Sequence, residues 1–332
     1  MHCRENELKL HLLFKNGRFF RFDRFLTRLI RIGSRFKVQK YFQFSLLRNK
    51  INKIVKIPFF KYQGTGNDFV MIDQRQQQFL KKTDVETINH LCDRRFGIGA
   101  DGLILLENPE KGVYTEGSSF DFQMIYFNAD GRESSMCGNG GRCLVAFANY
   151  LQVFDNQCVF NAIDGLHDAK VRVDGWVELK MIDVNQVEIG KDYYLLNTGS
   201  PHFVVFVEDL TDINVYENGR EIRYSERFHK EGVNVNFVEI KKDGSLEVAT
   251  YERGVEAETF SCGTGVTAAA IAFALKKALV FEEKIALSVP ILTKGGNLEV
   301  RLQRTAESGF QDLWLCGPAV QAFQGEVNIA DS

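Results

Sequence analysis

The short motif Cys-Gly-x-Gly occurs twice in this chain, and each copy directly precedes a run of residues with helical character. The first copy begins at Cys137 and the second at Cys262, 125 residues later. Repetition of this kind indicates a structural repeat. We expect two pseudo-symmetric domains, one formed by residues 55–186 with 316–330 and the other by residues 187–315.

The pattern of apolar residues predicts mixed strands and helices around each motif. In the first half, the expected strands are 57–62, 69–72, 103–106 and 120–127, and the expected helices are 83–96 and 143–151. In the second half, the expected strands are 203–207, 234–240, 246–251, 285–289 and 298–302, and the expected helix is 265–277. Thr83 and Glu86 offer a capping box for the first helix. The sequence therefore predicts an α/β (α+β) fold.

The first 54 residues differ in composition from the rest of the chain. They contain 14 Lys and Arg against 3 Asp and Glu, or +11, whereas residues 55–332 carry −13. Such a basic leader is compatible with an amphipathic arm that binds a membrane or nucleic acid and, more weakly, with an organelle transit peptide. We favour a third interpretation, in which the protein begins at Val55 and residues 1–54 reflect a misplaced gene start.

Composition excludes several classes of protein. Hydrophobic residues make up 45% of the 332 residues and charged residues 25%, which is close to the globular average. No run of about 18 apolar residues occurs, so we expect no transmembrane helix. Seven widely spaced cysteines do not resemble the disulfide framework of a small secreted domain. We therefore expect a cytoplasmic protein with no membrane or nucleic-acid partner.

The two motif cysteines are candidates for chemistry because of where they lie. At a helix start, backbone N–H groups and the positive end of the helix dipole stabilise an anion, which lowers the pKa of a thiol toward or below neutral. The glycines of the motif leave room for a ligand to approach these amides. For the four other cysteines in the domains, we expect ordinary burial as small hydrophobic residues; they are Cys92, Cys143, Cys158 and Cys316.

Other motifs have simpler explanations. Residues 97–102 fit G-x-G-x-x-G, but the match follows a helix and precedes a strand, so it predicts a turn rather than a dinucleotide site. Neither a phosphate-binding loop nor cysteine pairs with zinc-ligand spacing occur. His202 could serve as the base of a Cys-His protease, but a protease does not explain two matched cysteines.

Two matched acidic thiols favour a racemase or an epimerase. If one is a thiolate and the other a thiol, the first removes a proton from a carbon and the second delivers one to the opposite face. The helix starts would hold a carboxylate that stabilises the carbanion, through Gly138, Asn139, Gly263 and Thr264. No pyridoxal phosphate is needed. Four asparagines in expected turns would fix the substrate's polar groups, namely Asn67, Asn128, Asn139 and Asn234.

Seven segments in a fixed order closely resemble diaminopimelate epimerase. They are Gly64–Phe69, Gly97–Gly102, Phe127–Gly131, Met136–Arg142, Gly232–Asn234, Tyr251–Gly254 and Ser261–Gly265. The resemblance covers essentially residues 55–330. It implies the interconversion of LL- and meso-2,6-diaminopimelate without cofactor or metal, in the pathway to lysine and peptidoglycan. It also implies a homodimer and two domains, each a β-barrel-like sheet around a central helix, with the active site in the cleft between them.

The resemblance also implies roles for individual residues. Cys137 and Cys262 match the two catalytic acid–base residues, and Gly138, Asn139, Gly263 and Thr264 match the backbone cradles. The matching substrate ligands are Asn67, Asn128, Asn234, Glu252 and Arg253. His202 is an auxiliary residue, and which cysteine acts on which stereoisomer is not assigned.

The chain departs from the family pattern at two places. Ser200 replaces an asparagine of the usual Gly-Asn-Pro-His, and its hydroxyl can still form a hydrogen bond with shorter reach. Between Gly254 and Glu258 the chain has one residue more than the common pattern. Two alternatives stay open: a relative of proline racemase that also uses a cysteine pair, and a binding protein on the same scaffold without catalysis.

Overall fold

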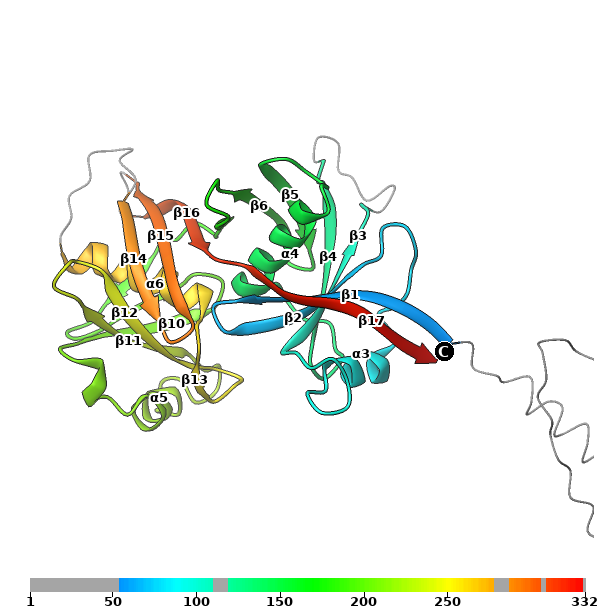
Figure 1. Cartoon of the computed structure of the whole chain (residues 1–332). Coiled ribbons are helices and arrows are strands. Elements are labelled where there is room, and N and C mark those ends of the chain that lie inside the picture. Colours follow the sequence, from blue (N-terminus) through cyan, green and yellow to red (C-terminus); the bar gives the residue numbers. More distant parts are fainter. Residues whose placement is uncertain (1–53, 110–118, 278–286, 306–308, 331–332) are drawn as a thin grey trace, which may run out of the picture. The chain divides into compact units, whose positions relative to one another are not determined.

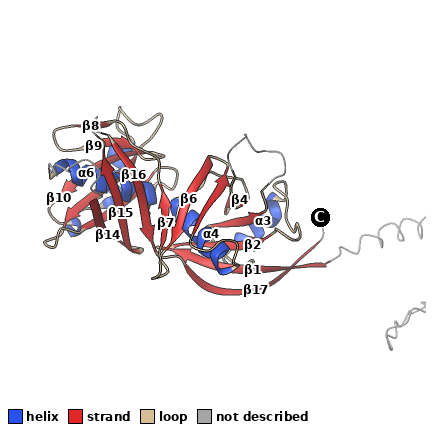
Figure 2. Ribbon diagram, turned by 90° about the horizontal axis from the view of Figure 1, so that it is seen from above, coloured by secondary structure: helices blue, strands red, loops and turns tan. Residues whose placement is uncertain are grey.

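The computed structural model of the chain describes residues 54–330 except 110–118, 278–286 and 306–308. The interpretations of the basic leader therefore lie outside the described residues. Within the described ranges, no helix is both long and apolar enough to cross a membrane. Strands predominate, and two of the helices are buried among them (Figures 1 and 2).

The elements follow one another in two sets. The first set consists of β1 (Ile54–Gly64), β2 (Asn67–Asp73), α3 (Val85–Cys92), β3 (Gly102–Glu107), β4 (Phe122–Asn128), α4 (Gly138–Tyr150), β5 (Gln157–Ala162), β6 (Gly165–Val171) and β7 (Val177–Lys180). The second consists of β8 (Val187–Ile189), β9 (Tyr194–Asn197), β10 (Pro201–Val207), the 3₁₀ turn η1 (Leu210–Asp212), α5 (Val215–Arg223), β11 (Asn234–Ile240), β12 (Leu246–Glu252), β13 (Ala257–Thr259), α6 (Gly263–Lys276), β14 (Leu287–Thr293), β15 (Gly296–Arg304) and β16 (Phe310–Gly317). The last strand, β17 (Val320–Ala330), returns to pair with β1.

The two sets have the same strand pairing. In the first, β2 and β3 are parallel, β3 and β4 antiparallel, β4 and β5 parallel, and β5, β6 and β7 antiparallel in turn. In the second, β10, β11, β12, β14, β15 and β16 repeat this sequence of parallel and antiparallel pairs. In each of these two series of paired strands, a helix follows the first strand (α3 after β2, α5 after β10), and the buried helix lies between the third and fourth strands (α4 between β4 and β5, α6 between β12 and β14). The predicted duplication is confirmed.

Each buried helix is the centre of its own hydrophobic core. Phe147 and Leu144 of α4 pack with residues of β2 to β7, and Ile271 and Val266 of α6 pack with residues of β10 to β16. Antiparallel pairing of β16 with β7 joins the two sets of strands. The two cores agree with two domains, and the boundaries given above stay a prediction.

Register identifies equivalent positions in the two sets. Phe69 of β2 pairs with Gly102, just as His202 of β10 pairs with Asn234. Asn67 and Ser200, each two residues earlier, are therefore equivalent. Asn128 is the last residue of β4, which pairs with β3, and Glu252 is the last residue of β12, which pairs with β11. Asn128 and Glu252 are therefore also equivalent.

Two expected elements differ from the structure. The helix expected at 83–96 is only Val85–Cys92, and its N-cap is Asp84, without a capping hydrogen bond from its side chain, so the capping box is wrong. The helix expected at 143–151 begins five residues earlier, at Gly138, because glycines are tolerated where the helix is buried on all sides. Of the strand expected at 285–289, residues 285 and 286 lie outside the described residues.

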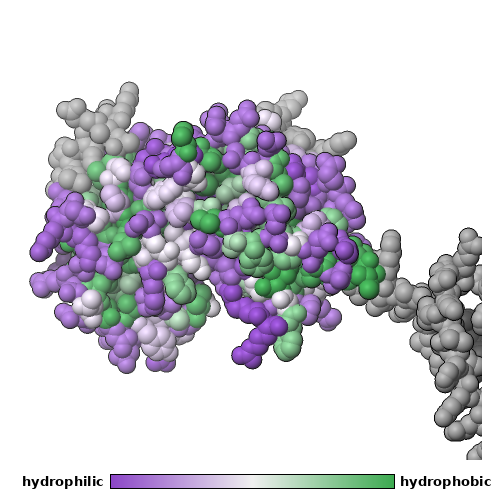
Figure 3. All heavy atoms as spheres, viewed as in Figure 1, coloured by the Kyte–Doolittle hydropathy of each residue, from purple (hydrophilic) through white to green (hydrophobic). Residues whose placement is uncertain are grey.

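The surface gives no separate indication of function. On the face drawn in Figure 3, hydrophilic residues predominate and hydrophobic ones form small groups between them. Scattered hydrophobic residues are normal on a protein surface. The candidate site is therefore defined by the buried starts of α4 and α6, where the two motif cysteines lie.

Candidate active site

Cys137 and Cys262 lie at the starts of the two buried helices. Both have the extended backbone of an N-cap residue, and the Sγ of Cys137 accepts a hydrogen bond from the N–H of Gly140 at 3.2 Å. The helix starts meet, because a Cβ atom built on Gly138 would lie 3.6 Å from the Cα of Gly263. Two positive helix ends are thereby directed at one place, where an anion is favoured.

Burial changes the expected acidity of the thiols. The pKa of Cys137 is raised above its usual value by burial, although the Gly140 N–H and the charge of Arg142 oppose this. Burial and the charge of Glu252 raise the pKa of Cys262 to about 12. The expectation of a pKa near or below neutral is therefore wrong for this structure, because loss of hydration outweighs the helix start.

We expect the alkylation of Cys262 by iodoacetamide to follow this raised pKa. Below the pKa, the thiolate fraction grows about tenfold per pH unit, so the rate should rise with a slope near 1 from pH 6 to 9 without a plateau. Peptide mass mapping at each pH measures it. A plateau below pH 8 would contradict the raised pKa.

Glu252 connects the two thiols electrostatically. It ends β12 and is partly buried, and burial raises the pKa of its carboxyl group. Its charge raises the pKa of both Cys137 and Cys262. An ionised Glu252 thus disfavours thiolates, and a substrate ammonium group placed beside it would relieve this effect.

His202 is fully buried at the start of β10 in a directed chain of hydrogen bonds. Thr250 donates to the Oδ1 of Asn236 at 2.9 Å, which fixes the amide so that its Nδ2 donates to the Nδ1 of His202 at 3.0 Å. The Nε2–H of His202 then donates to the hydroxyl of Thr264 at 2.9 Å, and this hydroxyl lies 3.4 Å from the Sγ of Cys262. His202 therefore orients the Thr264 hydroxyl toward the sulfur.

His202 should make the protein sensitive to acid. Burial lowers its pKa from 6.5 to about 3. Between these two pH values the imidazole is protonated in the unfolded chain but stays neutral in the folded chain. Stability due to the neutral ring is present above pH 6.5 and is lost as the pH falls, by about 2–3 kcal/mol at pH 4.5. We expect His202→Gln to lose less stability than the wild type between pH 7 and 4.5 in urea unfolding. The exposed His229, changed to Gln, is the control; equal losses for both variants would contradict the prediction.

Ser200, Asn234 and Arg253 form one cluster. The Nδ2 of Asn234 donates to the Ser200 hydroxyl at 2.9 Å, and the Arg253 backbone N–H donates to the Oδ1 of Asn234 at 2.8 Å. The Arg253 guanidinium also donates to the Ser200 hydroxyl, at 3.2 Å. The serine that departs from the family pattern is thus held among two predicted ligands. The extra residue lies in the turn between β12 and β13, where Glu256 has a φ of 58°.

Asn139 joins the two helix starts. Its Nδ2 donates to the Oδ1 of Asn67 at 2.6 Å and to the carbonyl of Ser261, the residue before Cys262, at 3.2 Å. The Nδ2 of Asn67 donates to Asp101 at 3.0 Å. The asparagines lie at strand ends and in the first helical turn rather than in free turns, and Asn128 is exposed at the end of β4.

Three residues of this region were not predicted from the sequence as part of a site: Thr65, Arg142 and Asn236. Arg142 had a recognisable signal, because it is the one charged residue in the otherwise small and apolar stretch 138–148. Thr65 and Asn236 had none, because a threonine in a turn and an asparagine in a strand are common.

The simpler explanations given for other motifs agree with the structure. The four remaining cysteines of the domains are buried, and residues 97–102 connect α3 to β3 as a turn. No cluster of metal-ligating side chains occurs in the described ranges.

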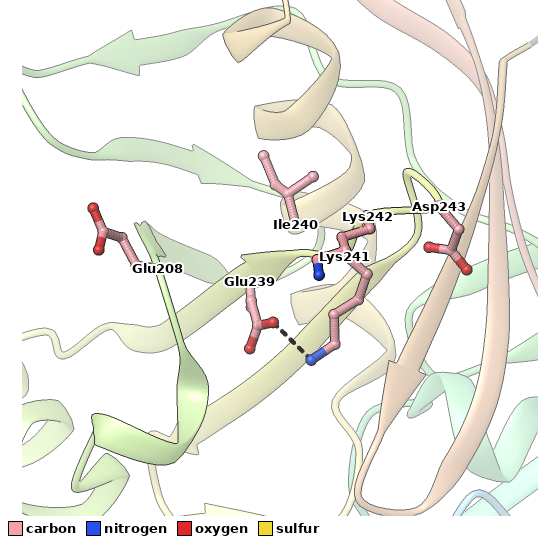
Figure 4. Close-up of a pocket in the computed structure, with 6 residues that line it drawn as sticks. All are labelled: Glu208, Glu239, Ile240, Lys241, Lys242 and Asp243. Carbon is pink, nitrogen blue, oxygen red and sulfur yellow. Dashed lines mark hydrogen bonds and ion pairs between the residues drawn. The ribbon is translucent and has the colours of Figure 1, made fainter.

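A surface recess elsewhere on the protein is a weaker candidate for a functional site. It is lined by Glu208, Glu239, Ile240, Lys241, Lys242 and Asp243 (Figure 4). Lys241 is already neutralised there, because it pairs with Glu239 at 2.7 Å and with Glu247. The recess lies at the Ile240 end of β11, about 20 Å along the strand from Asn234.

Comparisons with known proteins agree with one another. A family model described as "Diaminopimelate epimerase" matches residues 59–187 and 194–319. Diaminopimelate epimerase of Flavobacterium psychrophilum is 48% identical over 265 residues, which cover 80% of this chain and 98% of the relative. The protein of the same name from Aquifex aeolicus is 38% identical over 287 residues, covering 81% and 97%.

Solved structures show the same fold at low identity. A PhzF-family phenazine biosynthesis protein of Bacillus anthracis is 13% identical with a TM-score of 0.64, covering 83% of this chain and 100% of its own. A hydroxyproline epimerase from Agrobacterium vitis is 15% identical with a TM-score of 0.53, covering 83% and 93%. The two-domain α/β fold with matched halves is thus common to these proteins. With the family model and the relatives above, it follows that the chain belongs to the diaminopimelate epimerase family.

Proposed function

We propose that this chain interconverts LL- and meso-2,6-diaminopimelate by two-base proton transfer, in which one of Cys137 and Cys262 removes the α-proton and the other delivers a different proton. Membership of its family makes the chain an isomerase, and the reaction belongs to lysine biosynthesis. The observation that carries the two-thiol mechanism is the meeting of two helix starts, each capped by a cysteine, at Gly138 and Gly263.

The proposed step balances in protons and charge. The thiolate of one cysteine takes the α-proton and becomes a thiol, while the thiol of the other gives its proton to the opposite face and becomes a thiolate. The carbon is inverted, and the enzyme is left in the opposite protonation state, ready for the reverse direction. The step itself uses neither a cofactor nor a metal.

Burial serves this mechanism by keeping thiols weakly acidic. A thiolate with a raised pKa is a stronger base toward the weakly acidic α-proton than one stabilised by water. The amides at the starts of α4 and α6 are aimed where negative charge develops on the substrate carboxylate. We place this carboxylate at Gly138, Asn139, Gly263 and Thr264.

The remaining polar residues would select a substrate with two amino-acid ends. Arg253 supplies a positive charge for a distal carboxylate, and Glu252 supplies a carboxylate for an ammonium group. Asn67, Asn128, Ser200 and Asn234 offer further hydrogen bonds. A homodimer and a cytoplasmic location stay predictions.

Isotope exchange tests the proposal. Wild-type protein with reductant and no added cofactor is incubated with LL-diaminopimelate in D₂O, and the product is analysed for stereochemistry and deuterium. We expect solvent deuterium at the inverted α-carbon. Absence of exchange with both LL- and meso-diaminopimelate, together with exchange into proline-like substrates, would instead favour the proline racemase alternative.

A further inference from the structure

Arg142 is a fully buried arginine in the second turn of α4. Its Nη1 donates to the carbonyl of Gly138 at 3.3 Å, and its Nη2 donates to the hydroxyl of Thr65 and to the Oδ1 of Asn139, both at 3.0 Å. Its buried Nε has no hydrogen-bond partner. All three acceptors are neutral, so these contacts leave the positive charge unbalanced.

The titratable neighbours of Arg142 leave its charge unbalanced as well. None of the ion pairs among the described residues includes it, and the groups that influence its ionisation are the thiols of Cys143, Cys137 and Cys316. Burial raises the pKa of Cys316 to about 12 and that of Cys143 still further, so both are neutral at pH 7. Burial lowers the pKa of Arg142 from its usual value, but a guanidinium stays protonated in proteins. A buried charge without a counter-ion is unfavourable, so a functional reason is needed.

The second half of the protein lacks this charge. Thr267 lies five residues after Cys262, as Arg142 lies five residues after Cys137, and its hydroxyl donates to the carbonyl of Gly263 at 2.9 Å. The two side chains thus bind equivalent carbonyls in the two helices. At this position, five residues after the motif cysteine, only the α4 half carries a positive charge.

Arg142 also holds a strained turn. Thr65 lies between β1 and β2 with a φ of 49°, which a β-branched residue rarely adopts. Its hydroxyl is buried and receives the Arg142 hydrogen bond. This turn leads directly to Asn67, and Asn139 binds Asn67 in turn. Arg142 therefore holds two residues that define the position of a predicted substrate ligand.

We propose that Arg142 is a positioning residue that makes the α4 half of the site electropositive. Its charge is balanced when an anion, either the Cys137 thiolate or the substrate carboxylate, lies at the start of α4. This inference rests on the proposed function. It assigns Cys137 as the more acidic of the two thiols. The negative charge of Glu252 disfavours the thiolate at both cysteines, whereas the positive charge of Arg142 favours the thiolate at Cys137.

The variants Arg142→Met and Thr267→Val form a matched pair for the test. The rate of Cys137 alkylation is measured against pH with neutral iodoacetamide and with anionic iodoacetate, and the peptides are mapped by mass. We expect Arg142→Met to lower the iodoacetamide rate at a fixed pH by about tenfold, which corresponds to a pKa raised by about one unit. The preference for iodoacetate over iodoacetamide should fall by a similar factor. Thr267→Val should leave both readouts at Cys137 unchanged.

Arg142→Lys separates charge from geometry. It keeps the charge but lacks the fork that reaches Thr65 and Asn139. We expect it to restore most of the Cys137 alkylation profile while kcat for diaminopimelate stays reduced. A purely structural role for Arg142 would reduce stability in both variants and leave the alkylation profile unchanged.

Two results would overturn the inference. One is an unchanged alkylation profile of Cys137 in folded Arg142→Met protein. If that variant does not fold, the two cysteines of the wild type are compared instead. The inference requires the ratio of the iodoacetate rate to the iodoacetamide rate to be greater at Cys137 than at Cys262. Equal preferences overturn the inference. Failure of the proposed function is a different result, namely no isotope exchange by the wild type.

Discussion

Replacing either Cys137 or Cys262 by alanine is expected to lower kcat/KM for diaminopimelate by about 10³- to 10⁴-fold. Each direction of the proposed reaction needs one thiolate to take the proton and one thiol to give it. Loss of either therefore stops inversion in both directions. The rate is measured by chiral separation of the LL- and meso-isomers, with substrate varied so that kcat and KM are obtained separately.

Cys158→Ala is the matched control for this prediction. Cys158 is a buried cysteine of β5 that belongs to the core around α4, so its loss should reduce stability and leave kcat/KM within about twofold. If Cys137→Ala or Cys262→Ala kept activity near that of Cys158→Ala, the two-thiol mechanism would be wrong. The fold and the family would be unaffected.

Replacing Lys61 by methionine is expected to lower the free energy of unfolding by about 3 kcal/mol. Lys61 of β1 is buried, with 7% of its side chain exposed, and it pairs with Asp68 at 2.9 Å and donates to the carbonyl of Gly99. Arg94 binds Asp68 and Asp101 from the other side, at 2.7 and 2.6 Å. Without Lys61, Asp68 keeps only one of its two cations. Urea unfolding at pH 7 measures the loss.

Lys56→Met on the same strand is the control. Lys56 is 67% exposed and pairs with the exposed Glu326, so its removal should change the free energy of unfolding by no more than about 0.5 kcal/mol. Equal effects of the two substitutions would contradict the importance of the buried pair.

The same network predicts a dependence on pH. Hydrogen bonds and charges of Arg94 and Lys61 outweigh burial and hold the pKa of Asp68 well below its usual range. A carboxylate with a lowered pKa contributes stability that is present above about pH 4 and is lost as the pH falls further. The difference between wild type and Lys61→Met should therefore shrink below pH 4. Because Asp101 also accepts a hydrogen bond from Asn67, this network supports a predicted ligand.

Much of the fold was predictable from local patterns. Alternating apolar residues placed β11 at 234–240, and the Ala-rich run placed α6 within two residues of its start. Local signals failed where tertiary packing decides. The glycines of 138–141 have poor helix propensity, yet they form the first turn of α4 because the helix is enclosed by strands.

For the site, the sequence by itself determined which residue types stand at the helix starts. A duplicated Cys-Gly-x-Gly before a helical run is a local feature, whereas the structure shows that each cysteine is the N-cap residue itself. Only the tertiary structure brought Gly138 against Gly263 and Asn139 against Ser261, because these contacts join segments more than 100 residues apart. It also decided the acidity of the thiols, since desolvation depends on every element packed around a group. For the same reason, only the folded chain reveals that the charge of Arg142 is buried among neutral partners.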